Sequence, residues 1–148
     1  MNILAPVSSI MTKKVIAVGP EDELSLVKEI FEKNHIHHLP VVRHDTLVGM
    51  VSKTDFDVYY RTLSRHFEDK FVNDTLLRVH RVKEIMTAKL AKVEPDDRIN
   101  VALEVFKVNR FHALPVVENG ELVGILTTYD IINALSNEVV HDSDYKTI

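Results

Sequence analysis

The sequence contains no cysteine, which excludes several kinds of structure and chemistry at once. The chain can form no disulfide, offers no thiolate nucleophile, and cannot hold zinc or an iron–sulfur cluster through cysteine. No apolar run approaches the roughly 20 residues that cross a bilayer. Residues 1–6 lack both the basic part and the long apolar part of a secretory signal. We therefore expect a cytoplasmic protein without membrane insertion.

The sequence also has only a small excess of charge of either sign. The 148 residues include 22 acidic and 18 basic side chains, which gives a formal charge of −4 without any basic block. Binding to nucleic acid is therefore not expected. Apolar residues make up 45% of the chain and charged residues 27%, close to the averages of globular proteins, so we expect a folded chain with one core or two small units.

The sequence does contain an internal repeat. Residues 7–57 align with residues 82–132 at a constant offset of 75 and without a gap, and 20 of the 51 pairs are identical. Because two copies are too few for a solenoid, we expect a pseudo-symmetric pair in which each copy covers the apolar face of the other. Such an arrangement creates two equivalent clefts between the halves, where pockets commonly form.

Both copies have the same predicted order of elements, β-α-β-β-α. Short apolar runs at 15–18 and 90–93 predict the first strands. Apolar residues at helical spacing predict helices that begin near Leu24 and Ile99. Two further strands and a second helix follow in each copy, at 39–42, 47–52 and from Lys53, and at the equivalent positions 75 residues later. The predicted fold class is α/β (α+β), with two pseudo-symmetric repeats.

The repeat also sets the expected boundaries. They are an N-terminal tail (1–6), a first repeat (7–66), a helical linker (67–81), a second repeat (82–136) and a C-terminal tail (137–148). We interpret Asp22 and Asp97 as N-caps of the first helix in each copy.

A hydrophobic-Pro-Val-Val motif followed by Leu-Val-Gly-x-x-[Ser/Thr]-x-x-Asp occurs in both copies. This pattern resembles the cystathionine β-synthase (CBS) domain, and two copies in tandem resemble a Bateman module, over roughly residues 7–136. The resemblance implies a stand-alone homodimeric module, not an enzyme, that binds AMP, ADP, ATP, S-adenosylmethionine or a related adenine ligand and regulates an unknown partner protein. The alternative is a ligand-free scaffold for dimerisation or interaction.

The Gly-x-x-[Ser/Thr]-x-x-Asp segments that end at Asp55 and Asp130 have two interpretations. In the structural one, the hydroxyl and the acid form a capping box at a helix start. In the functional one, free N–H groups of the helix start receive a phosphate, and the carboxylate accepts hydrogen bonds from the two hydroxyls of a ribose. The sequence leaves both open.

The family resemblance assigns residues to the two clefts position by position. Cleft one would be formed by Lys14, Ile16, Ile36, His37, His38, Thr127 and Asp130. Cleft two would be formed by Lys89, Ala91, Phe111, His112, Ala113, Ser52 and Asp55. Ile36 and Phe111 would bound the adenine. Some family members have an arginine where His38 and Ala113 stand, so the two clefts are expected to differ in phosphate affinity.

A phosphate in these clefts would need a cation nearby. The candidates are Lys14, Lys53, Lys89, Arg110 and protonated forms of His37, His38 or His112. The histidine-rich segment 35–38 resembles a metal site, but no cysteine or paired acid lies near it in sequence, so we expect no metal. Motifs of hydrolases and nucleotide-binding loops are also missing from the sequence.

Overall fold

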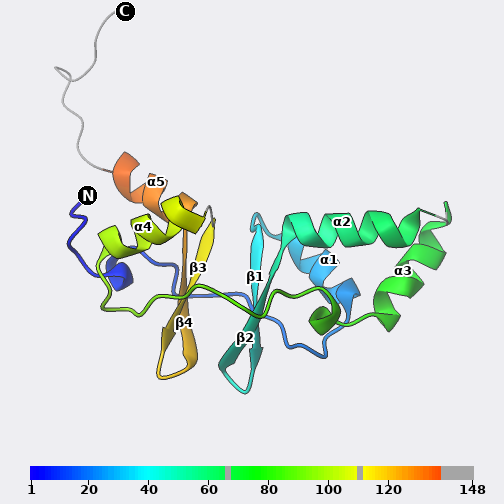
Figure 1. Ribbon diagram of the computed structural model, residues 1–148. Coiled ribbons are helices and arrows are strands. Elements are labelled where there is room, and N and C mark those ends of the chain that lie inside the picture. Colours follow the sequence, from blue (N-terminus) through cyan, green and yellow to red (C-terminus); the bar gives the residue numbers. More distant parts are fainter. Residues whose placement is uncertain (66–67, 110–111, 138–148) are drawn as a thin grey trace, which may run out of the picture.

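Two β-hairpins form the centre of the computed structural model, which describes residues 1–65, 68–109 and 112–137. The first hairpin pairs β1 (His38–Arg43) with β2 (Thr46–Ser52), and the second pairs β3 (Ala113–Glu118) with β4 (Glu121–Thr127). The hairpins share one four-stranded sheet in the order β1-β2-β4-β3, although β2 and β4 pair only at Thr46 and Glu121. The hairpins therefore diverge from this single junction (Figure 1).

Both hairpins turn through two residues with positive φ. These are His44 and Asp45 in the first hairpin, and Asn119 and Gly120 in the second. Two successive left-handed residues are typical of the tight turns that match the right-handed twist of the strands. The predicted hairpins are thus confirmed, with the same register in both halves.

The predicted strands at 15–18 and 90–93 are wrong. Only Val18 and Val93 form isolated parallel bridges, to Val41 and Val116. The N–H of Val18 donates to the carbonyl of Pro40, but Pro40 has no N–H to donate to the preceding part of the segment. Pro115 stands at the equivalent position beside Val93, so the ladder stops in the same way in the second half.

Helices cover the hairpins in both halves. The first half contains α1 (Leu24–Lys33) and α2 (Lys53–Ser64), and the second contains α4 (Ile99–Asn109) and α5 (Thr128–Ser136). Leu24, Val27 and Phe31 on α1 are buried, as the helical spacing predicts.

The predicted N-caps at Asp22 and Asp97 are wrong. The Asp22 carboxylate accepts a hydrogen bond from the N–H of Gly19 at 2.7 Å, and the Asp97 carboxylate accepts one from Glu94 at 2.8 Å. Both side chains close the turn before the helix, and Glu23 takes the N-cap position of α1.

The start of each repeat packs into the core of the other. A short 3-10 helix, η1 (Val7–Ser9), begins the first repeat, and η2 (Val82–Glu84) begins the second. Val7 is fully buried in the apolar cluster of the second half, and Val82 is fully buried in that of the first. The N–H of Val7 donates to the carbonyl of Asp97 at 2.7 Å, which fixes the crossing. The repeats are therefore interlocked in space.

The glycine in each Leu-Val-Gly motif permits this crossing. A Cβ at Gly49 would lie 2.7 Å from the Met86 sulfur, and one at Gly124 would lie 2.6 Å from the Met11 sulfur. We call the stretches that follow η1 and η2 and contain Thr12 and Thr87 the crossing segments. Thr87 pairs with Met50 of β2, next to Gly49, so any side chain at position 49 would push this crossing segment away from the sheet.

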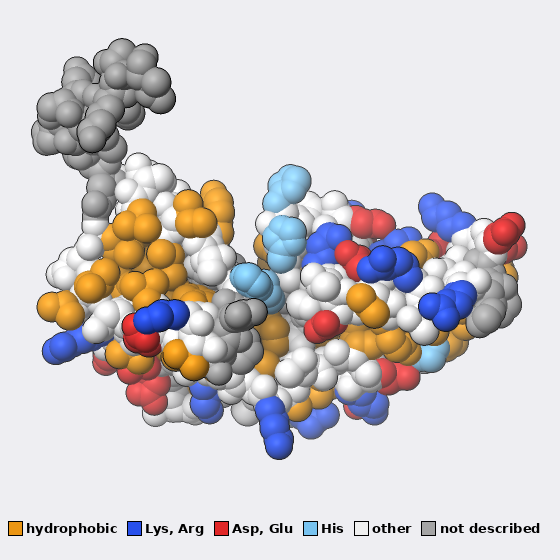
Figure 2. Space-filling model, turned by 45° about the horizontal axis from the view of Figure 1, so that its top comes forward, with side chains coloured by type: hydrophobic (Ala, Val, Ile, Leu, Met, Phe, Trp, Pro, Cys, Tyr) orange, Lys and Arg blue, Asp and Glu red, His pale blue; other side chains and the backbone are white. Residues whose placement is uncertain are grey.

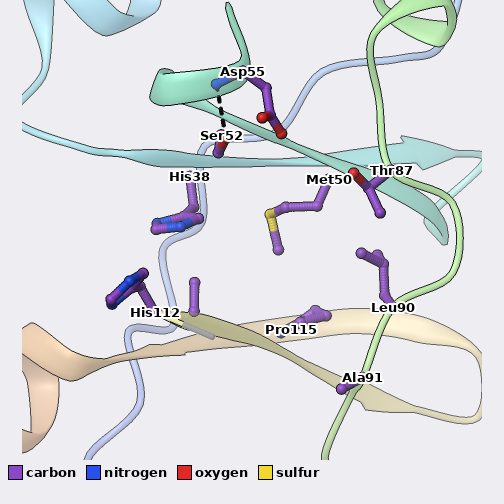
Figure 3. Close-up of a pocket in the computed structure, with 10 residues that line it drawn as sticks. His38, Met50, Ser52, Asp55, Thr87, Leu90, Ala91, His112 and Pro115 are labelled. Atoms are coloured by element: carbon purple, nitrogen blue, oxygen red, sulfur yellow. Dashed lines mark hydrogen bonds between the residues drawn. The ribbon is translucent and has the colours of Figure 1, made fainter. Parts of the chain in front are cut away.

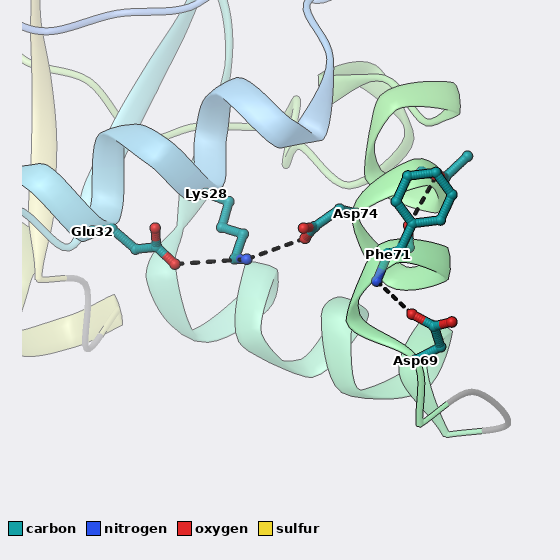
Figure 4. Close-up of polar contacts among 6 residues, drawn as sticks. Lys28, Glu32, Asp69, Phe71 and Asp74 are labelled. Carbon is teal, nitrogen blue, oxygen red and sulfur yellow. Dashed lines mark hydrogen bonds and ion pairs between the residues drawn. The ribbon is translucent and has the colours of Figure 1, made fainter.

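The segment between the repeats contains α3 (Lys70–Val79), a helix that packs on α1 and α2. Leu77 of α3 is buried in the core of the first half. Lys28 Nζ on α1 lies 3.4 Å from Asp74 Oδ1 on α3 (Figure 4). Asp69 caps α3 by accepting a hydrogen bond from the N–H of Phe71 at 2.8 Å. The predicted linker segment thus contains a helix.

Among the described residues, no helix combines the length and the apolar character that crossing a membrane requires.

Candidate functional site

Two cavities of unequal size lie between the halves. The larger has a volume of about 860 Å³ and the smaller one of about 240 Å³. Both are lined by His38, Ser52, Asp55 and His112, so they share one wall. The repeat predicts two equivalent clefts, whereas these two cavities are unequal in volume and adjoin each other.

The strand register and the helix starts bring these side chains together. His38 opens β1 and pairs with Ser52 at the end of β2, and Ala113 pairs in the same way with Thr127. Because α2 begins directly after β2, Asp55 lies in its first turn, facing the gap between the halves. The chain has the same local design in both halves.

The carboxylate of Asp130 accepts three hydrogen bonds within the protein. Its Oδ2 accepts hydrogen bonds from the N–H and the hydroxyl of Thr127, both at 2.7 Å. Its Oδ1 accepts a third hydrogen bond, at 2.9 Å, from the hydroxyl of Thr12 on the crossing segment of the first repeat. The capping-box interpretation is confirmed for this motif.

Asp55 differs from its counterpart. Its N–H donates to the Ser52 hydroxyl at 3.0 Å, which is half of a capping box. Within the described part of the chain, no group donates a hydrogen bond to the Asp55 carboxylate, which is exposed at the wall of both cavities (Figure 3). Of the two motif carboxylates, Asp55 is therefore the one that has both oxygens available to a ligand, whereas Asp130 already accepts three hydrogen bonds.

The helix starts offer fewer free N–H groups than the sequence suggests. The N–H of Lys53 donates to the carbonyl of His37 at 2.8 Å, and that of Thr128 donates to the carbonyl of His112 at 3.1 Å. The N–H groups of Asp55 and Asp130 bond the preceding hydroxyls. These bonds already use two donors in the first turn of each helix, leaving a smaller anion site than a bare helix start.

His38 and His112 face each other at one end of the smaller cavity (Figure 3). Burial lowers the pKa of His38 below the usual value of histidine, and the nearby His112 and His37 lower it further, while Asp55 has the opposite, smaller effect. His38 is therefore neutral at pH 7 in the absence of a bound anion.

The structure brings together most of the residues assigned to each cleft. Ile36, His37, His38, Thr127 and Asp130 line the larger cavity. Ser52, Asp55, Ala91, His112 and Ala113 line the smaller one.

The remaining assigned residues are not brought to these cavities. Lys14 and Lys89 are exposed and line neither, and Ile16 is also absent from both walls. Lys53 forms an ion pair with Asp57 on its own helix, at 2.9 Å. Phe111, like Arg110, lies outside the described residues.

Several lining residues were not assigned from the sequence. They are Thr12, His35, Met50, Thr87, Leu90, Pro115 and Ile125, together with polar residues near the helix starts. Thr12 and Thr87 belong to the repeated Ile-Met-Thr motif, and their recurrence was the available signal. Their position follows from the crossing of the repeats, which the alignment does not reveal. In the described part of the chain, no group of three or more acidic or histidine side chains is arranged to hold a metal ion.

An interlocked pair of β-α-β-β-α-like repeats with cavities between them defines the class of this protein. It belongs to the CBS domain family, whose model matches residues 7–60 and again residues 82–137. The fold class and the tandem pair predicted from the sequence are therefore confirmed.

The relatives include a protein of similar length and a much longer enzyme. An uncharacterized protein of Methanocaldococcus jannaschii is 32% identical, and the match covers 83% of this chain and 87% of that protein. Inosine-5'-monophosphate dehydrogenase of Thermoplasma acidophilum is 31% identical over 84% of this chain, but the match spans only 22% of that enzyme.

Solved structures show the same fold. The CBS domain of a CBS domain-containing membrane protein from Sphaerobacter thermophilus is 26% identical, with a TM-score of 0.73 and coverage of 88% of both chains. CBSX2, solved in complex with AMP, is 25% identical with a TM-score of 0.72, and the match covers 89% of this chain and 96% of that one.

Proposed function

We propose that the protein is a regulatory module that binds an adenine nucleotide or a related adenosyl ligand between its two CBS repeats and thereby modulates a partner protein. The observation that carries this proposal is the exposed Asp55 carboxylate, to which no described residue donates a hydrogen bond, at the wall of both cavities. A carboxylate in this state suits the adjacent hydroxyls of a ribose, since it is an acceptor only.

The dimensions of the larger cavity support the proposal. Its volume of about 860 Å³ lies within the range of about 300–1,000 Å³ that is typical of small-molecule sites. The smaller cavity, at about 240 Å³, is just below that range. CBSX2, which was solved with AMP, has the same fold. We therefore place a ribose at Asp55 and propose AMP, ADP, ATP or S-adenosylmethionine as the ligands to test.

Regulation would follow from the interlocked repeats. Each crossing segment is hydrogen-bonded to the sheet of the other half, at Thr12 to Ile125 and at Thr87 to Met50. A ligand that contacts both halves changes the balance between arrangements of the halves only if it binds one arrangement more tightly. A partner that contacts both halves would detect that change.

The test is isothermal titration calorimetry with AMP, ATP and S-adenosylmethionine. Loss of charge-assisted hydrogen bonds in Asp55→Ala should weaken binding by about 10- to 100-fold. Asp57→Ala is the matched control, because Asp57 lies on the same helix but lines neither cavity. No binding of any of the three ligands, or equal affinity in Asp55→Ala and wild type, would reject the proposal.

The scaffold alternative is favoured by one observation, the three hydrogen bonds that the Asp130 carboxylate accepts within the protein. In this alternative the cavities stay empty and the protein serves only dimerisation or docking. It predicts that the melting temperature is unchanged by added nucleotide. A ligand at 100 times its dissociation constant would instead stabilise the protein by about 2.7 kcal/mol.

We propose a homodimer on the outer face of α4 and α5. Val108 and Ile132 are exposed there, and the space-filling view shows apolar side chains gathered over these helices (Figure 2). The equivalent residues of the first half, 75 positions earlier, are polar, so the fold itself does not require apolar side chains at these sites. A second copy, with the same apolar face, is the proposed occupant. Ile132→Asp should shift sedimentation toward the monomer, whereas a dimer that persists unchanged would contradict this interface.

A further inference from the structure

The larger cavity has an unusual set of titratable side chains. Four histidines line it, together with two carboxylates and one tyrosine: His35, His37, His38, His112, Asp55, Asp130 and Tyr129. Among the described residues that line this cavity, none is lysine or arginine. Histidine side chains are visible at the hollow between the two halves (Figure 2). Any positive charge that these residues supply therefore has to come from protonated imidazoles.

The surroundings of His38 show how these groups interact. The charged or titratable neighbours that act on it come from three parts of the chain. His37 precedes β1, His112 precedes β3, and Asp55 lies on α2. With the histidines neutral, the charged side chains among these lining residues are the two carboxylates. An anion would then meet a net negative wall, while each proton taken up by an imidazole makes the wall more positive.

We propose that this cavity binds a phosphate-bearing ligand together with protons, which are taken up by His38 and the neighbouring histidines. The inference rests on the proposed function and adds to it the regulation of the site by pH. Binding of AMP, whose phosphate is a dianion above its second ionisation near pH 6, stabilises the protonated imidazoles. A ligand with the same base and ribose but no phosphate needs no such proton.

The chain offers natural choices for test variants. Position 113, equivalent to His38 in the second repeat, is alanine, so His38→Ala introduces a residue that the same fold already accepts there. His112→Ala removes the histidine on the other side of the shared wall. His44→Asn is the matched control, since His44 lies in the β1–β2 turn, lines neither cavity, and has a positive φ that asparagine tolerates.

The experiment is calorimetry of wild-type protein with AMP and with adenosine, at pH 7.0 in two buffers of different ionisation enthalpy. We expect uptake of about one proton per AMP and close to none per adenosine. By linkage, the affinity for AMP should rise about three- to tenfold from pH 8.0 to pH 7.0, where the AMP phosphate remains mostly dianionic. In the double variant His38→Ala, His112→Ala the uptake should fall, and in His44→Asn it should not change.

The outcomes separate the two proposals. AMP binding without proton uptake, or uptake that persists unchanged in the double variant, overturns the inference and leaves the proposed function intact. Equal uptake with AMP and adenosine also overturns it, because the phosphate would then not be the cause. Failure of AMP, ATP and S-adenosylmethionine to bind at any pH from 6.5 to 8.0 rejects the proposed function and this inference with it.

Discussion

Replacing Asp130 by alanine is expected to destabilise the protein, whereas replacing Asp55 by alanine should have little effect on stability. Both residues occupy the same position in a Ser/Thr-x-x-Asp motif at a helix start. Only Asp130 accepts hydrogen bonds from described residues, two from Thr127 and one from Thr12. The difference between the two variants therefore isolates these bonds.

The magnitude follows from what each variant loses. Both variants lose the interaction of an acid with the helix dipole, which contributes about 0.3–1 kcal/mol. Asp130→Ala also loses its part of the capping box and the bond to Thr12, and cap removal costs about 0.5–2 kcal/mol. We expect the free energy of unfolding to be about 1–2 kcal/mol lower for Asp130→Ala than for Asp55→Ala.

The assay is urea unfolding of both variants and the wild type without ligand. With a slope of about 2 kcal/mol per molar urea, the two variant midpoints should differ by roughly 0.5–1 M. Thr12→Val serves as a second probe, because it removes only the bond across the crossing segment and should lie between them. Equal midpoints, or a lower midpoint for Asp55→Ala, would refute the assignment of Asp130 as structural and Asp55 as free.

Three further predictions concern stability. Gly49→Ala and Gly124→Ala should each cost about 1–3 kcal/mol in urea unfolding by overpacking the crossing segments, whereas Gly19→Ala, whose Cβ would meet only ordinary contacts, should not. Asp69→Ala should lower stability by about 1 kcal/mol through loss of the α3 cap, with helix content followed by circular dichroism. Because the pKa of His38 is lowered by folding, its contribution should destabilise the protein as pH falls through about 6.5, and His38→Ala should show a smaller loss between pH 7.5 and 5.5.

Each of these predictions has a contradicting result. If Gly49→Ala and Gly124→Ala were as stable as Gly19→Ala, the crossing segments would not lie as close to these glycines as the structure places them. An Asp69→Ala variant with unchanged stability would show that the α3 cap contributes nothing. If the stability of His38→Ala fell with pH as steeply as that of the wild type, the His38 imidazole would not be the group that titrates.

The hairpins and the main helices could be predicted from the sequence because their signals are local. Because the sequence repeats after 75 residues, each signal occurs twice. Short apolar runs with polar turn residues between them predicted both hairpins. The first strands were wrong because a proline in the neighbouring strand removes a donor, and this effect depends on which strands are adjacent. The caps at Asp22 and Asp97 were wrong because a turn and a helix start use the same residue types.

The site could be predicted only in part, because its differences come from contacts across the halves. The motifs that end in Asp55 and Asp130 are equivalent in sequence, yet Thr12, which is 118 positions away along the chain, engages Asp130 alone. The lysines at 14 and 89 were assigned from the family resemblance, but both are exposed and neither lines a cavity. His35, His37 and His38 are neighbours in the sequence, but His112 joins them at the larger cavity only because the two halves come together.

The most direct test of the account is a crystal structure of the protein grown with saturating AMP. We predict that the ribose hydroxyls donate to the Asp55 carboxylate, with the nucleotide between the halves, while Asp130 keeps its bonds to Thr127 and Thr12. Electron density showing both cavities empty, or AMP bound away from Asp55, would contradict the claim that this carboxylate binds the ribose of a ligand.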